Sequence, residues 1–164
     1  MQPLNQFPEE IAKNIVCVFT DIDDTLTTEG SLPACAYKAL EALTNAGIHV
    51  APITGRPAGW CDMIARLWPV AGVVGENGAF YFSYDRDQKK MIRAYDTDEL
   101  TRTSDRKRLD NIAERILTEV PGCAISVDQT FRDTDLAIDI AEDVPELDEP
   151  SVLRIKEIFE EEGA

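Results

Sequence analysis

The sequence predicts an α/β fold built around a parallel sheet. Three short apolar runs at residues 15–19, 48–53 and 70–74 are each bounded by turn residues. Runs of this length are typical of strands that are buried on both faces, as they are in parallel sheets. Segments with helical spacing lie between these runs, so strands and helices alternate along the chain.

The first two strands flank a helix with clear end signals. Ile15–Phe19 is the first expected strand, and a loop from Asp21 to Leu32 follows it. Pro33 suits the first turn of the next helix and Gly47 suits its end. Ile48–Ile53 is the second expected strand, although Pro52 inside it cannot donate a ladder hydrogen bond.

The next segment predicts a helix, a third strand and a hairpin. Ala58–Leu67 is the expected helix and Val70–Val74 the expected strand. Asn77-Gly78 is a strong hairpin signal, because both residues tolerate positive φ angles. Ala79–Tyr84 and Met91–Tyr95 would then form the two strands that follow this turn.

The composition changes from about Thr97. Thr97–Val120 is long, charged and helical, and Pro121-Gly122 ends it. Cys123–Val127 and Leu136–Ile140 predict two antiparallel strands, and a last helix carries one apolar stripe. We therefore expect two parts, residues 1–96 and residues 97–164.

Composition excludes several classes of partner. The 164 residues suffice for one domain and its core, or for one small domain and part of another. The net charge of −15, from 16 basic and 31 acidic residues, argues against nucleic acid and anionic membrane surfaces. No apolar run approaches the roughly 20 residues of a membrane span, and Met1–Glu10 lacks signal-peptide features. Four cysteines without CxxC spacing favour a reduced, cytoplasmic protein.

Polar residues follow the first two expected strands and form the candidate site. Asp21 and Asp23 would lie at the carboxyl edge of the sheet, where open α/β folds bind ligands. Two carboxylates there repel one another unless a cation offsets them, and Mg²⁺ takes oxygen ligands of this kind. Thr54, with the N–H groups of the following turn, would form a phosphate cradle. The alternatives are a solvated turn or a helix N-cap for the acids, and an ordinary helix N-cap for Thr54.

Asp21-x-Asp23-x-Thr25 after an apolar strand resembles the first signature of the haloacid dehalogenase (HAD) superfamily, mostly Mg²⁺-dependent phosphohydrolases with a Rossmann-like core. The resemblance implies that Asp21 is the nucleophile and Asp23 the general acid and base. It also implies that both residues ligate Mg²⁺, Asp23 through its backbone carbonyl. Asp24 stands where the family most often has Gly, and Asp tolerates a left-handed turn better than most residues.

Two further motifs are similar to the subgroup with a type 2 cap. This subgroup includes Cof-like, sucrose-phosphate, mannosyl-phosphoglycerate and archaeal phosphoglycolate phosphatases, and the motifs are Thr54-Gly55-Arg56-Pro57 and Glu76-Asn77-Gly78-Ala79. The likeness implies that Thr54 holds a phosphoryl oxygen, and it makes Gly55, Arg56 and Asn77 candidate substrate or phosphate contacts. Arg56 would either steer the anion or pair with a surface acid, and hairpin geometry alone is the alternative for Asn77.

The resemblance covers only the first half of the family's pattern. The family supplies a Lys and further acids after the cap, whereas this chain ends at Ala164 inside the cap-like part. We therefore expect an incomplete N-terminal half of the core with an α/β cap segment, truncated within the cap. The sheet would show an unpaired edge through which the chain could associate with itself.

Two functions follow from these motifs. The first is a Mg²⁺-dependent phosphohydrolase of small phosphomonoesters, a sugar phosphate or a phosphoglycerate-type metabolite, acting through an aspartyl-phosphate. The second is a catalytically silent half-domain that binds metal or phosphate weakly or completes its fold with another chain. A receiver-type phosphoacceptor would use similar acids but leaves the cap-like half without a role.

Overall fold

The computed structural model describes residues 6–164 and divides them into two compact units. The first unit holds residues 6–56 and 60–94, and the second holds residues 57–59 and 95–164. Part of Met1–Glu10, the segment that lacks signal-peptide features, lies outside the described residues. Next to it, α1 (Glu9–Ala12) is a single helical turn.

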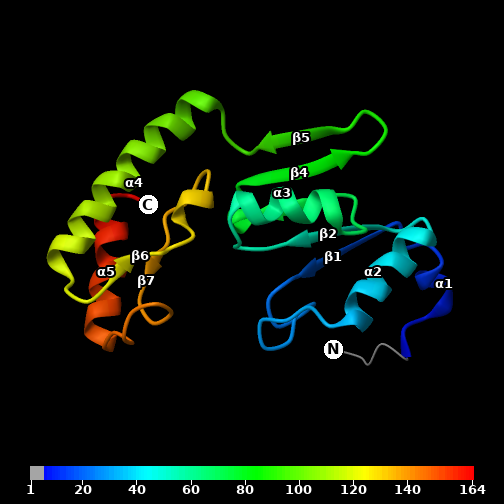
Figure 1. The fold of residues 1–164 in the computed structure, drawn as a ribbon, viewed down its shortest axis with the longest axis horizontal. Helices are drawn as coiled ribbons and strands as arrows, with labels where there is room; N and C mark the ends of the chain where they lie inside the picture. Colours follow the sequence, from blue (N-terminus) through cyan, green and yellow to red (C-terminus); the bar gives the residue numbers. More distant parts are fainter. Residues whose placement is uncertain (1–5) are drawn as a thin grey trace. The chain divides into compact units, whose positions relative to one another are not determined.

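The first unit is organised around a five-stranded sheet (Figure 1), in which the strand order is β1-β2-β3-β4-β5. The strands β1 (Cys17–Asp21), β2 (His49–Ile53) and β3 (Val73–Gly75) are parallel, and β4 (Phe80–Asp85) runs antiparallel to β3. The strand β5 (Lys90–Tyr95) ends the sheet. The connecting helices are α2 (Ala34–Asn45) and α3 (Ala58–Leu67). This architecture confirms the predicted α/β fold.

The core of the first unit lies between the sheet and its helices. Val50 and Val73 in neighbouring strands are fully buried, as is Ile64 of α3. Phe80 and Phe82 of β4 stack with ring centroids 4.2 Å apart. Burial of these large apolar side chains stabilises the packing of the helices against the sheet. This packing holds the strands that carry the candidate residues.

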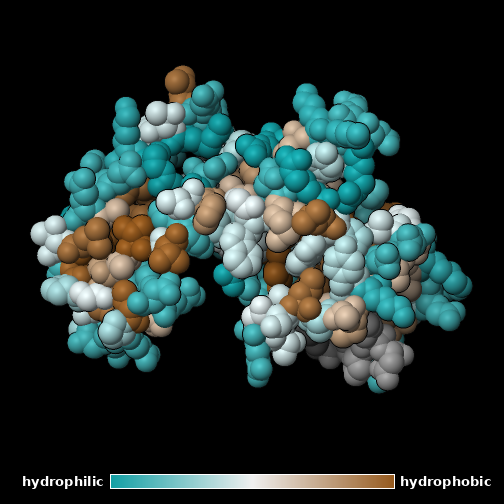
Figure 2. All heavy atoms as spheres, viewed as in Figure 1, coloured by the Kyte–Doolittle hydropathy of each residue, from teal (hydrophilic) through white to brown (hydrophobic). Residues whose placement is uncertain are grey.

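The second unit packs two helices beside a small antiparallel sheet. The helices are α4 (Glu99–Glu119) and α5 (Glu149–Glu161), and the strands are β6 (Ala124–Ile125) and β7 (Ile138–Asp139). Apolar side chains gather over β6, β7 and α5 (Figure 2). The buried core consists of five aliphatic residues: Ile112, Ile116, Val120, Ile155 and Ile158. Within residues 6–164, every helix is too short or too polar to cross a lipid bilayer.

Several strands are shorter than the sequence predicted. β3 begins at Val73 rather than Val70, because the Val70 N–H turns back to the Trp68 carbonyl and the Tyr81 hydroxyl binds the Ala71 carbonyl. The strands β6 and β7 have two residues each instead of five. Here Gln129 donates to the Asp135 carbonyl and accepts from the Ala137 N–H, so side-chain bonds replace ladder bonds.

Candidate active site

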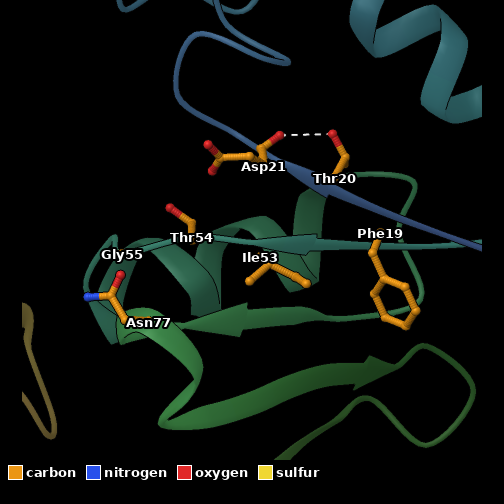
Figure 3. A pocket seen from close by; sticks show the side chains of 7 residues that line it. All are labelled: Phe19, Thr20, Asp21, Ile53, Thr54, Gly55 and Asn77. Atoms are coloured by element: carbon orange, nitrogen blue, oxygen red, sulfur yellow. Dashed lines mark hydrogen bonds between the residues drawn. The ribbon is translucent and has the colours of Figure 1, made fainter. Parts of the chain in front are cut away.

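The candidate residues come from the segments at the carboxyl ends of β1, β2 and β3. Asp21 lies opposite Ile53 in the parallel ladder of β1 and β2, so Thr54 follows directly beside it. Ile53 in turn lies opposite Val74, which places the turn after β3 on the far side of Thr54. An open cavity of about 440 Å³ at this edge (Figure 3) is lined by Phe19, Thr20, Asp21, Ile53, Thr54, Gly55 and Asn77.

Local hydrogen bonds fix Asp21 at the mouth of this cavity. One oxygen of its carboxylate accepts the Ile22 backbone N–H at 2.7 Å. The Thr20 hydroxyl donates to the Asp21 backbone carbonyl at 2.9 Å. In Figure 3 the Thr54 hydroxyl is turned toward Asp21 across the edge of the sheet. A carboxylate and a hydroxyl from neighbouring strands therefore share one open space.

The loop after β1 is a tight turn, and several of its hydrogen bonds go to one backbone carbonyl. The Ile22 carbonyl accepts the Leu26 and Thr27 N–H groups at 3.0 and 2.9 Å, together with the Thr27 hydroxyl. The same hydroxyl accepts the Asp24 N–H at 3.1 Å. Asp24 has a φ angle of 54°, in the left-handed region that Asp tolerates. The structure thus accommodates Asp at the position where the resemblance led us to expect Gly.

Thr54 is held among three strands of the sheet. Its side chain is 3% exposed, and its hydroxyl accepts the Arg56 N–H at 3.1 Å. Its own N–H donates to the Val74 carbonyl at 3.0 Å, and its carbonyl accepts the Asn77 N–H at 3.1 Å. The Arg56 N–H lies before α3 begins at Ala58, so Thr54 does not act as the N-cap that was its alternative role.

Gly55 and Asn77 are matched in shape. A Cβ atom added at Gly55 would lie 3.0 Å from Oδ1 of Asn77, so the glycine leaves room for the amide. Glu76 and Asn77 both adopt left-handed φ angles, 44° and 57°, in the 3₁₀ turn η2 (Glu76–Gly78). Asn tolerates a left-handed φ angle, and a tight hairpin turn requires one, so the backbone of Asn77 fits the hairpin role. Asn77 also lines the cavity, which keeps it a candidate contact for a ligand.

Arg56 binds Asp23 through both carboxylate oxygens. Its Nη2 lies 2.7 Å from Oδ1 of Asp23, and its Nε lies 3.1 Å from Oδ2. The guanidinium also stacks 4.9 Å from the ring centre of Trp60. Of the two roles left open for Arg56, the structure shows pairing with an acid. That acid is Asp23, whose carboxylate does not line the cavity.

The oxygen donors at this edge match part of what Mg²⁺ requires. Asp21 offers a carboxylate, and the Asp23 backbone carbonyl accepts no hydrogen bond from residues 6–164. Within the described part of the chain, no group of three or more His, Cys, Asp or Glu side chains could hold a metal ion. Since Mg²⁺ is often bound by one or two carboxylates with water and substrate phosphate, these donors fit part of its octahedral shell.

The sequence reasoning missed the position of Trp60 beneath Arg56. Trp60 is 45% exposed, so it contributes little to the core of the first unit. It follows Arg56 by four residues, a spacing that brings side chains onto the same side of a helix start. That spacing was the signal from which the contact could have been inferred.

The comparisons with known proteins agree with this geometry. The family model for haloacid dehalogenase-like hydrolases matches residues 18–135. Protein 0175 of Thermoplasma acidophilum shares the fold with a TM-score of 0.68 and 15% identity, over 91% of this chain and 58% of that one. The IMP-nucleotidase of Plasmodium falciparum gives a TM-score of 0.57 and 11% identity, over 90% and 42%. No curated protein sequence matches.

This chain therefore spans less than two thirds of the length of either structural neighbour. At these identities the two structures show a common fold and nothing finer. The family model covers more than half of the chain, and residues 18–135 include every candidate site residue, from Asp21 to Asn77. The protein belongs to the haloacid dehalogenase-like hydrolase family.

Proposed function

We propose that this chain carries the phosphoryl-transfer site of a Mg²⁺-dependent phosphohydrolase that acts on small phosphomonoesters. The observation that carries the proposal is the Asp21 carboxylate facing the Thr54 hydroxyl at the open edge of the sheet. A carboxylate can attack phosphorus, and an adjacent hydroxyl donor can hold a phosphoryl oxygen as negative charge develops.

The proposed chemistry has two steps. An oxygen of Asp21 bonds to phosphorus as the bond to the leaving oxygen breaks, and Asp23 gives that oxygen a proton. Asp23 then takes a proton from water, which attacks phosphorus and releases Asp21 and inorganic phosphate. Mg²⁺, held by the Asp21 carboxylate and the Asp23 carbonyl, would offset phosphoryl charge when bound.

The neighbouring residues have supporting roles in this proposal. The Thr54 hydroxyl accepts the Arg56 N–H, which leaves its own proton for a phosphoryl oxygen. Gly55 admits the Asn77 amide to the cavity wall, where it would contact the substrate. Arg56 orients the Asp23 carboxylate by its two-point contact.

We propose a small phosphorylated metabolite as the substrate. The motifs resembling the type 2 capped subgroup support a sugar phosphate or a phosphoglycerate-type metabolite. One structural neighbour is named an IMP-nucleotidase, so a nucleoside monophosphate belongs in the same panel. We propose a cytoplasmic location, because the four cysteines among residues 6–164 are all free, as is usual in reducing compartments.

The Asp21→Asn variant tests the proposal. We expect the chain with Mg²⁺ to hydrolyse at least one member of the phosphomonoester panel, and we expect Asp21→Asn to abolish turnover, measured as phosphate release. Asp24→Asn is the matched control, since it makes the same change in the same loop at a residue outside the cavity. Turnover that survives in Asp21→Asn would remove the nucleophile assignment.

A second candidate is the catalytically silent half-domain. It is favoured by the small number of acidic ligands near Asp21 in residues 6–164 and by the position of β1 at the sheet edge. In that case phosphate with Mg²⁺ would shift amide resonances near Asp21 and Thr54 without turnover. Pairing through β1 with a second copy would appear in sedimentation as a concentration-dependent dimer.

A further inference from the structure

The second unit has a polar cavity of its own, beside the N-terminal half of α4. This α4 cavity has a volume of about 330 Å³ and is lined by Glu99, Arg102, Thr103, Arg106, Lys107 and Asp133. Three of its six residues are basic, in a chain whose net charge is −15. We propose that the α4 cavity binds a small dianion, an inorganic phosphate or the phosphate group of a metabolite. The residues that line it all belong to the second unit, and the proposal does not depend on the hydrolase proposal.

Among residues 6–164, the basic side chains of the α4 cavity have no carboxylate partner closer than 3.9 Å. Arg102 donates to the Thr97 backbone carbonyl and Arg106 to the Asp135 backbone carbonyl at 2.7 Å, both uncharged acceptors. Arg102 and Lys107 form no ion pair with any residue from 6 to 164. The pKa of Asp98 is lowered mainly by hydrogen bonds from Thr101, and the nearby charge of Arg102 adds to this effect. The one acidic contact of Arg106 is Asp110, at 3.9 Å.

Other arginines of the second unit form close ion pairs with carboxylates. Arg115 contacts three glutamates and Arg154 also contacts three, while Arg132 lies between two aspartates. Positive charge that is already paired offers little to an anion. The α4 cavity is therefore a place in this unit where guanidinium charge remains available to a ligand.

The two arginines are also held in place before any ligand binds. The Arg102 guanidinium carbon lies 4.0 Å from the ring centre of Tyr95, whose hydroxyl donates to Asp133 at 2.6 Å. Arg106 is anchored by its bond to the Asp135 carbonyl, yet its side chain remains 31% exposed. Side chains that are already ordered lose less entropy on binding, so more of the contact energy appears as affinity.

Helix geometry brings the donors together. Arg102 and Arg106 are four residues apart, as are Thr103 and Lys107, so each pair lies on adjacent turns of one face. These turns belong to the N-terminal half of α4, which begins at Glu99. Hydrophilic residues cover the outward side of α4 (Figure 2). The acids Glu99 and Asp133 would confine the anion to the basic side of the cavity.

The test is a titration of the full chain with sodium phosphate, followed by amide resonances at constant ionic strength in chloride. We expect saturable shifts at residues 99–107 and at Asp133, with an affinity in the millimolar range. Arg102→Gln and Arg106→Gln should each weaken binding at least about fivefold, because each removes charge-assisted hydrogen bonds. Lys107→Gln, at an exposed position, should weaken it without any risk to the fold.

Arg108→Gln is the matched control. Arg108 lies on the same helix outside the α4 cavity, and it is paired with Asp105 at 3.0 Å. The Arg108→Gln variant should bind phosphate with the same affinity as the unaltered chain. The proposal is overturned by shifts that do not saturate, by equal weakening in Arg108→Gln, or by a response confined to residues 20–22 and 54–56. The last result would place phosphate at the Asp21 cavity alone, and so it also separates this proposal from the hydrolase proposal.

Discussion

At the scale of single residues, Arg56 links more of the candidate site than any motif indicated. Its side chain donates hydrogen bonds to the Asp23 carboxylate and stacks on Trp60, while its backbone N–H donates to the Thr54 hydroxyl. One residue therefore connects the loop after β1 with the loop after β2. The carboxylate of Asp23 does not line the cavity, and its direction is fixed by the two-point contact with Arg56.

Arg56→Gln should free the Asp23 carboxylate without unfolding the first unit. Because general acid–base help is typically worth 10²- to 10⁴-fold in rate, we expect kcat to fall by about tenfold or more, with a smaller change in KM. Arg56→Lys keeps the charge but loses the planar fork, so it should restore only part of the rate. Steady-state kinetics on the phosphomonoester panel measure both values. A rise in KM alone would mean that Arg56 contacts the substrate instead of orienting Asp23.

At the scale of elements, a network of ion pairs joins α4 and α5. We call this network the clasp. Arg115 contacts Glu119 and Glu162, both at 2.7 Å, and also Glu161. Arg154 contacts Glu119 at 2.6 Å and Glu161 at 3.0 Å. Hydrogen bonds from Arg115 and Arg154 lower the pKa of Glu119, and bonds from Arg154 and Arg115 lower the pKa of Glu161.

A lowered pKa in the folded state fixes the sign of the pH dependence. The clasp contributes its full stability above the ordinary glutamate pKa of 4.5, and this contribution is lost as the pH falls below that value. Thermal melts followed by circular dichroism should therefore show a steeper loss of stability in acid for the unaltered chain than for Glu119→Gln. Glu114→Gln, on the same helix but outside the clasp, should keep the steep profile. Added salt should weaken the effect, because these side chains are partly exposed to solvent.

Element boundaries were predictable where one strong local signal set them. The helix expected at Ala58–Leu67 has those bounds in the structure. β6 and β7 were overestimated because Gln129 competes for backbone groups that a strand ladder would use, and no pattern in the sequence reveals that competition. In the candidate site, the alternation of strands and helices predicts that Asp21 and Thr54 lie at the same edge of the sheet, but it does not predict the register that pairs Asp21 with Ile53. The partner of Arg56 could not be predicted from the sequence. The ion pair joins residues 33 positions apart, and the chain offers 31 acidic residues as possible partners.

At the scale of the whole molecule, each unit has its own buried core. Val50, Val73 and Phe80 belong to the first, and Ile112, Ile116 and Ile158 belong to the second. Because each set of side chains packs within its own unit, damage to one core should be felt mainly by the unit that contains it.

Ile116→Ala tests this independence. Ile116 is fully buried, so the truncation should cost the second unit about 2–5 kcal/mol. Native-state hydrogen exchange should show faster exchange in α4 and α5, with little change at β1 and β2. Leu117→Ala is the control at the next position, where the side chain is 46% exposed and the cost should be small. Equal acceleration in both units would show that they unfold together.

The division into units also has an evolutionary consequence. Every candidate residue from Asp21 to Asn77 belongs to the first unit, and apart from residues 57–59 the second unit is one continuous segment, 95–164. Drift, insertion or recombination within that segment leaves the Asp21–Ile53 register of β1 and β2 intact. Descendants of this gene can therefore inherit an unchanged set of candidate site residues while the remainder of the coding sequence diverges at its own pace.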